Sequence, residues 1–245
     1  MKFLMGFLAG LLVLVVLVVL VAGYFGFVPG VSSLFGSDKA ADLGVDYTQS
    51  DYQSARAKGD IDRVDLPEST PPGSSVQFIG QHPASFSLSN AEATALVGEK
   101  SWLYFPIRDA QIRFNADGTT EFSGILMIDK LKDFTASFGV TGDEYNTALE
   151  WVDRMTILQS NLPFYIKGSG SVTNGVFDFH TDEVKLGRAN IPLDDLNENK
   201  AEAISSVKSF LARIPGFSVR NFSVSAGRMN FDGTLPDSVS RAVED

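Results

Sequence analysis

Residues 107–128 read IRDAQIRFNADGTTEFSGILMI, and this stretch decides the fold class. Apolar and polar side chains alternate on both sides of the turn sequence Asn-Ala-Asp-Gly at 115–118. Alternation with a period of two around a glycine-containing turn predicts a β-hairpin. From Ile125 to Ile128 every side chain is apolar, so this part of the second strand is either covered by protein on both faces or lines a cavity.

A second hairpin is predicted over residues 162–186, where Asn174-Gly175 is a typical turn signal between two strand-like halves. Glycines inside strands accompany bulges and bends, because they leave the pleated surface without a side chain. We therefore expect a curved sheet, since the predicted strands contain Gly124, Gly168 and Gly170.

A third hairpin is predicted around residues 226–227, close to the C-terminus. The apolar positions of its first strand are odd-numbered up to Val219 and even-numbered from Phe222 onward. A shift of one residue is what a β-bulge produces, and bulges curve sheets.

Between the hairpins, apolar residues recur at helical spacing. The predicted helices cover residues 90–97, opened by a capping box of Ser89 and Glu92, and residues 131–138, 145–158 and 195–214. A strand interrupted at His82-Pro83 is predicted over 76–88. The fold class is therefore α+β, a curved antiparallel sheet of hairpins packed with amphipathic helices.

The N-terminal stretch 3–28, FLMGFLAGLLVLVVLVVLVAGYFGFV, contains no charged side chain. It exceeds the roughly 20 apolar residues that a membrane-spanning helix needs. A cleaved secretory signal is the alternative, but its apolar core is shorter, about 7 to 15 residues. We predict an uncleaved transmembrane anchor over residues 1–28. Lys2 precedes the run and Asp38 is the first charge after it, which predicts a single-pass protein of the cell membrane with a cytoplasmic N-terminus and an extracytoplasmic body.

Residues 29–73 are predicted to form a juxtamembrane stalk. It contains a short helix that Thr48 caps and Gly59 ends, and a linker rich in proline and serine at 66–75. The short helix either belongs to the stalk or packs back on the main domain. That domain is predicted over residues 74–245.

Composition restricts the function classes. The chain has a formal net charge of −10, which argues against nucleic-acid binding, and it has no cysteine, which excludes disulfides and thiolate metal sites. Ser169 does not match a nucleophile elbow, because a strand continues after it. We predict no enzyme activity, no catalytic residue and no cofactor.

One group of metal-ligand residues needs separate consideration. Asp178, His180 and Asp182 alternate along a strand end, so their side chains can share one face and hold a divalent ion. The alternative is a solvated strand face, which we favour because the sequence positions no fourth ligand. No metal site is predicted.

Phenylalanine is abundant, with nineteen in the chain. One interpretation is a phenylalanine-rich core. The other is an apolar groove between a curved sheet and a helix, able to accept an acyl chain. For that groove the candidate ligand-binding residues are Phe122, Ile125, Met127, Phe164, Ile166 and Phe210.

Four stretches carry a family resemblance: LSNAEATALV, FNADGTTEFSGIL, LPFYIKGSGSVTNGVFDF and SVSAGRMNFDGTLPDSV. In this order, after an N-terminal anchor, they resemble the YpmS-like and LmeA-like envelope proteins of bacteria, which are similar to tubular lipid-binding (TULIP) domains. The resemblance covers about residues 78–239 and finds no counterpart for the helical segment 130–159. It implies non-catalytic lipid binding or transport in the cell envelope.

Two functions follow from these observations. The first is a membrane-anchored, extracytoplasmic module that binds or handles lipid. The second is a structural or assembly protein of the envelope that acts through contacts with a protein partner, and it predicts a closed core without a groove.

Overall fold

The computed structural model describes residues 31–98, 102–139, 161–194 and 200–244, together with residues 17, 20–22 and 28. The strands are β1 (Asp62–Leu66), β2 (Val76–Ile79), β3 (His82–Leu88), β4 (Ile107–Phe114), β5 (Thr119–Met127), β6 (Asn161–Thr173), β7 (Val176–Leu186), β8 (Ala189–Asn190), β9 (Ser218–Ser225), β10 (Arg228–Leu235) and β11 (Ser238–Ala242). The helices are α2 (Val31–Leu34), α3 (Gln49–Gly59), α4 (Asn90–Gly98), α5 (Leu131–Ser137) and α8 (Lys200–Leu211), with 3-10 turns at Pro72–Ser74 and Ile128–Lys130.

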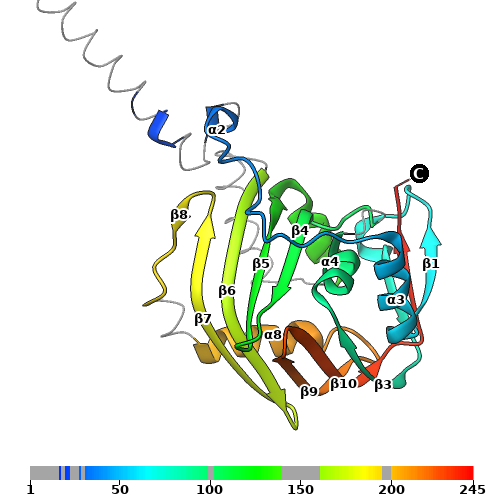
Figure 1. Ribbon diagram of the computed structural model, residues 1–245. Helices are drawn as coiled ribbons and strands as arrows, with labels where there is room; N and C mark the ends of the chain where they lie inside the picture. The colour runs from blue at the N-terminus through cyan, green and yellow to red at the C-terminus, as the bar shows by residue number, and fades with distance from the viewer. Residues whose placement is uncertain are drawn as a thin grey trace, which may run out of the picture.

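The main sheet is strongly curved (Figure 1). Its strand order is β3-β10-β9-β6-β5-β4, and β7 and β8 extend it beside β6. β6 runs past two neighbours on the same edge: Asn161 to Ser169 pair with β5, whereas Val172 and Thr173 pair with β9. This change of partner lets one long strand turn the sheet through its bend. The predicted α+β class with a curved antiparallel sheet is confirmed.

All three predicted hairpins are present, formed by β4–β5, β6–β7 and β9–β10. The turn residues Asn174 and Gly175 have φ of 51° and 76°, and Ala226 and Gly227 have φ of 50° and 72°. Two successive residues with positive φ make a turn whose twist matches the flanking strands, which is why Asn-Gly predicts it so well.

The predicted bulge lies in β9. Val219 pairs with Gly233 and Asn221 with Asp232, which leaves Arg220 as the extra residue. A Cβ on Gly233 would approach the Ser218 carbonyl oxygen to 2.0 Å, so the bulge requires glycine there. The bulge turns Val219 and Phe222 toward the same face of the sheet.

A second bulge bends the β6–β7 pair. Lys167 pairs with Glu183 and Gly168 with Thr181, so Asp182 is the extra residue. A Cβ on Gly168 would lie 2.4 Å from the His180 carbonyl oxygen. Gly168 therefore permits the close backbone approach of this bulge.

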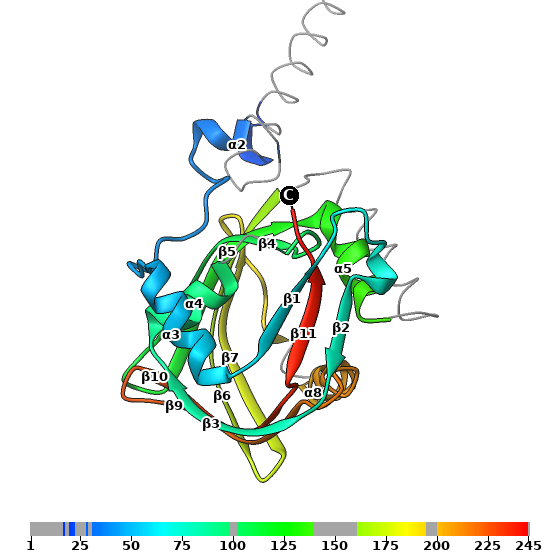
Figure 2. The ribbon, with the colours of Figure 1, turned by 90° about the vertical axis from the view of Figure 1, so that its right-hand side faces the viewer.

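A smaller sheet closes one side of the molecule, with the order β1-β11-β2 (Figure 2). β1 is parallel to β11 and β2 is antiparallel to it. The segment 76–88, predicted as one interrupted strand, divides at Gly80, whose φ of +71° lets β2 and β3 enter different sheets.

The short helix α3 packs back on the domain. Its Ala55 lies in a buried cluster with Leu88, Ala93 and Phe114. β1 was not predicted, because its exposed edge position gives it no apolar alternation and its pairing partner lies about 175 residues further along the chain. The folded body therefore starts upstream of residue 74.

The N-caps predicted at Thr48 and Ser89 are both present, each as a capping box. Thr48 and Asp51 cap α3, and Ser89 and Glu92 cap α4. Glu92 also accepts hydrogen bonds from Lys58 and Ser54 of α3. Burial would raise the pKa of Glu92, but these bonds outweigh it and lower that pKa to about 2. The carboxylate thus joins the two helices as an ion.

Several predictions concern residues outside the described ones. They include the helix 145–158, residues 195–199 of the last predicted helix, and nearly all of the N-terminal anchor. α5 and α8 confirm the described parts of the predicted helices. Within the described ranges, no helix has the length and apolar character to cross a bilayer.

Candidate ligand-binding cavity

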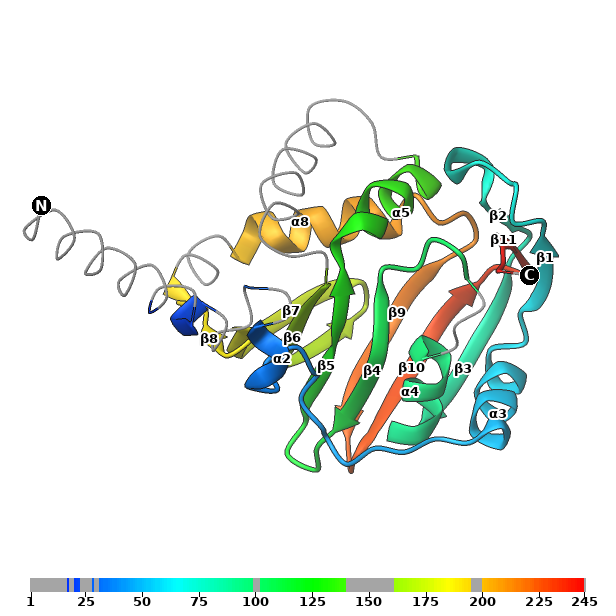
Figure 3. The ribbon, with the colours of Figure 1, turned by 90° about the horizontal axis from the view of Figure 1, so that it is seen from above.

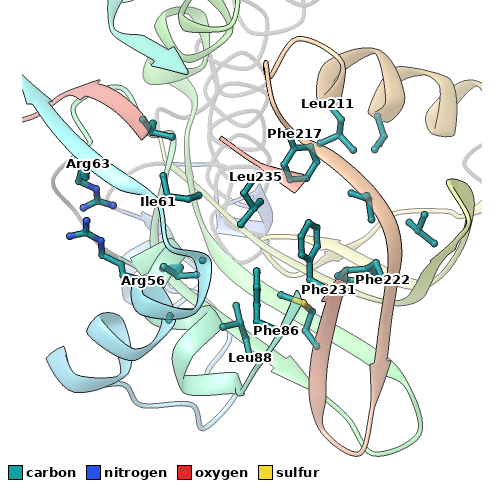
Figure 4. Close-up of a pocket in the computed structure, with 18 of the residues that line it drawn as sticks. Arg56, Ile61, Arg63, Phe86, Leu88, Leu211, Phe217, Phe222, Phe231 and Leu235 are labelled. Carbon is teal, nitrogen blue, oxygen red and sulfur yellow. The ribbon is translucent and has the colours of Figure 1, made fainter. Parts of the chain in front are cut away.

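An apolar cavity of about 540 Å³ lies between the curved sheet, α8 and the α3–β1 segment, and residues that line it are drawn in Figure 4. Figure 3 shows the arrangement of these elements from above. Apart from one glycine and four charged residues, every lining residue is apolar. Ligand sites of small molecules span roughly 300–1,000 Å³, so the cavity has the size of a site for one ligand.

The floor of the cavity comes from β3, β9 and β10. Phe86 and Phe231 stack with ring centroids 5.1 Å apart, and Phe217 lies 6.1 Å from Phe231. Strand alternation places Phe86 and Phe231 on one face, and the bulge at Arg220 brings Val219 and Phe222 to that face as well. The shift in the spacing of apolar residues that the sequence shows therefore places Val219 and Phe222 on the floor of the cavity.

A second wall comes from the β6–β7 hairpin. Val172, Phe177 and Phe179 line the cavity here. Phe179 lies over Gly170, where a Cβ would come within 2.7 Å of its ring. The glycine thus makes room for an aromatic side chain of the lining.

The helices complete the enclosure. α8 contributes Val207 and Leu211. α3 contributes Ala55 and Gly59, which are one turn apart and small. Because this helix face carries little side-chain volume, space remains between α3 and the phenylalanines of the sheet.

The α3–β1 end of the cavity is charged, with Arg56, Arg63 and Arg241 against Asp62. The guanidinium carbons of Arg56 and Arg63 lie 5.9 Å and 5.5 Å from the ring centroid of Tyr52. Arg241, on β11, is only 8% exposed. Figure 4 shows Arg56 and Arg63 together on this side and the phenylalanines grouped further in.

The six residues predicted for a groove are not among those that line this cavity. Phe122 and Phe164 meet edge to face with centroids 5.0 Å apart, and Ile125 is 3% exposed. Met127 is half-buried at the end of β5, and Ile166 is 40% exposed on β6. These five residues share the β5–β6 region of the sheet.

Phe210, the sixth, belongs to a different aromatic cluster. Its ring centroid lies 4.8 Å from Phe138 and 6.5 Å from Phe134, both on the α5 segment. The six candidates are therefore divided between two places, and their role in ligand binding stays a prediction.

Sequence reasoning missed most of the actual lining. Phe86 was placed on a strand but not connected with Phe231, since 145 positions separate them and only the β3–β10 pairing joins them. The change of phase at Val219 and Phe222 was the one local signal that pointed to this wall.

A polar network lies on the face of β4, β5 and β6 opposite the side chain of Phe122. Arg113 Nη2 donates to both carboxylate oxygens of Glu121, at 2.8 and 2.9 Å, and Arg113 Nε donates to Oε1 at 3.1 Å. Glu121 accepts further bonds from Asn115 and Tyr165. Burial and the bond to Glu121 raise the pKa of Tyr165 to about 12. Against the effect of burial, the hydrogen bonds lower the pKa of Glu121. The network ties three strands together on the side away from Phe122.

Of the three residues considered as metal ligands, His180 and Asp182, the extra residue of the β7 bulge, lie side by side. His180 Nε2 lies 3.3 Å from Asp182 Oδ1. Across the described parts of the chain, no three His, Cys, Asp or Glu side chains are placed to share a metal ion.

The other histidine joins three segments. His82 Nε2 lies 3.0 Å from the Gly59 carbonyl oxygen, and Nδ1 lies 3.0 Å from Asp237 Oδ1. These two acceptors favour the imidazolium and raise the pKa of His82 above its ordinary value of 6.5. His82 therefore connects the end of α3, the start of β3 and the β10–β11 turn.

Comparison with known proteins adds no relative. Neither a family model, a curated protein nor a solved structure matches this chain.

Proposed function

We propose that this protein is a membrane-anchored, extracytoplasmic protein that binds or handles lipid in the cell envelope and does not act as an enzyme. The observation that carries the proposal is the apolar cavity of about 540 Å³. Apolar surface that faces a cavity is stabilised when a hydrocarbon ligand replaces water against it. An acyl chain is a cellular ligand with that chemistry.

The N-terminal sequence supports the location. Residues 3–28 contain no charge and exceed the length needed to span a bilayer. Lys2 on one side and the first acidic residue, Asp38, on the other favour a cytoplasmic N-terminus. A body tethered in this way meets membrane lipids at high local concentration.

A structural or assembly role is the alternative. That role predicts a closed core, whereas the described residues surround an open apolar volume. The chemistry of the lining also favours binding over catalysis, since its described members are aliphatic and aromatic residues, one methionine, one glycine, three arginines and one aspartate. A nucleophile with a positioned base has no counterpart in that set.

The test compares the lipid retained by the wild-type protein with that retained by a variant whose cavity is filled by a larger side chain. The full chain is purified in mild detergent, and the lipid retained per protein is measured by mass spectrometry. Val219→Trp directs a large side chain into the cavity, and Ser223→Trp places the same side chain on the exposed face of the same strand. We expect Val219→Trp to lose retained lipid and Ser223→Trp to keep it, with both variants folded by circular dichroism. Equal lipid in the wild type and both variants would refute the proposal.

A further inference from the structure

Two smaller hollows adjoin the apolar cavity on different sides. One, of about 300 Å³, lies between α8, β9 and the turn of the β6–β7 hairpin, and we call it the α8 opening. The other, of about 260 Å³, lies between α3 and the start of β1, and we call it the α3 opening. Figure 4 shows Leu211 and Phe217 on the side of the α8 opening, and Arg56 on the side of the α3 opening. Each hollow shares lining residues with the cavity, so each is a candidate passage to the surface.

The α8 opening has an apolar inner part and an exposed rim. The residues that it shares with the cavity are all apolar and half-buried: Phe177, Leu211, Phe217 and Val219. The described residues that it does not share are all exposed: Gly175, Lys208, Ala212 and Ser218. Exposure thus increases from the cavity outward, as it does along a passage from an interior to solvent. A hydrocarbon chain on this route stays in contact with apolar side chains until it reaches the rim.

The α3 opening has a different chemical character. The residues that it shares with the cavity are Arg56, Ile61 and Asp62, and its rim contains the exposed Asp60. A hydrocarbon chain that passes here must displace water from charged groups, and desolvation of a charge is unfavourable. This cost favours the α8 opening as the route for an apolar ligand.

The surroundings of the α8 opening suit the same role. Val176 follows Gly175 at the hairpin turn and is 68% exposed, and Val207 of α8 lines the cavity and is 41% exposed. Exposed apolar groups beside a passage give a lipid chain contacts on its way between water and the cavity. Lys208 Nζ lies 5.2 Å from the ring centroid of Phe177. The contact of an exposed ammonium group with a ring is weak, so this long side chain can move aside at small cost.

We propose that lipid enters and leaves the cavity through the α8 opening, between α8 and the strands β7 and β9. This inference rests on the proposed lipid-binding function and deepens it by naming the passage that the ligand uses. The continuous apolar lining from the cavity to the half-buried residues of the opening carries it.

The experiment closes each opening in turn with a reversible bridge. The chain has no cysteine, so introduced thiols are the only ones. Lys208→Cys with Ser218→Cys spans the α8 opening, and Ala57→Cys with Asp62→Cys spans the α3 opening; each pair joins a helix to the first residue of a strand. Ala212→Cys with Ser218→Cys is a second pair for the α8 opening, one helical turn further on.

A bismaleimide that contains a disulfide bridges each pair, and a reductant reopens the bridge. The full chain in mild detergent is loaded with 11-(dansylamino)undecanoate, a fluorescent fatty-acid analogue. Its release into excess unlabelled palmitate is followed by stopped-flow fluorescence. Every bridged protein is compared with the same protein after reduction, so the effects of the substitutions themselves cancel.

We expect both bridges across the α8 opening to slow release about tenfold or more, and reduction to restore the rate, because a closed passage makes exit rate-limiting. The bridge across the α3 opening should change the rate by less than about twofold. If the α3 bridge slows release as much as the α8 bridges, or if no bridge slows it, the passage is wrong while lipid binding stands. If the wild type takes up no probe and is purified without lipid, the proposed function itself fails.

Discussion

The two halves of the curved sheet have similar apolar patterns, yet they pack differently. In the β5–β6 half, Ile125, Leu162 and Ile128 are at most 3% exposed. In the β9–β10 half, Val219 and Phe222 remain half-buried and face the cavity. The comparison teaches that periodicity identifies which side chains point inward, but not whether an opposing surface reaches them.

Truncation of one phenylalanine in each half tests this difference most strongly. Phe164→Ala removes a ring that is 8% exposed and packs against Phe122, so we expect it to lower the free energy of unfolding by about 3–5 kcal/mol. Phe222→Ala enlarges a space that already exists, and we expect roughly 1–2 kcal/mol. Urea denaturation of the detergent-solubilised full chain measures both. Equal losses would show that the two halves are packed alike.

A smaller change addresses the bulge of the cavity half. Gly233→Ala places a methyl group 2.0 Å from the Ser218 carbonyl oxygen, so the backbone must shift, and we expect a loss of about 1–3 kcal/mol. Gly73→Ala is the matched control, since no atom lies within 4 Å of the place that its added methyl group would take. The same denaturation experiment applies. If Gly233→Ala is as stable as the control, the bulge does not depend on glycine.

The smallest expected effect concerns the His82 contacts beside the cavity. Hydrogen bonding to the Gly59 carbonyl and to Asp237 raises the pKa of His82 in the folded state. Its contribution to stability is therefore complete below its ordinary pKa of 6.5 and is lost as the pH rises through the raised value. Thermal denaturation of the full chain at about pH 6 and about pH 8.5 should show a lower midpoint at the higher pH.

His82→Asn should remove this part of the pH dependence, whereas His180→Asn, on the exposed face of β7, should keep it. An identical pH dependence in wild type and His82→Asn would contradict the assignment.

Much of the local structure was predictable. The Asn-Gly turn at 174–175, the capping box of Ser89 and Glu92, and the bulge next to Val219 all depend on residues within a few positions of one another. For the candidate site the prediction was weaker. It chose the most continuous apolar run, around Ile125, and that run lies in the closely packed half of the sheet.

The sequence by itself determined the hairpins, the helices α3, α4, α5 and α8, the curvature of the sheet and the acidic character of the chain, because turn residues, caps and periodicity act over short distances along the backbone. Only the tertiary structure decided where the apolar residues leave a cavity and which charges lie at its end. Phe86 meets Phe231, and Arg56 meets Arg63 on Tyr52, through strand pairing and helix packing. The size of a cavity depends on the distance between surfaces that come from separate parts of the chain. A local pattern of residues does not determine that distance.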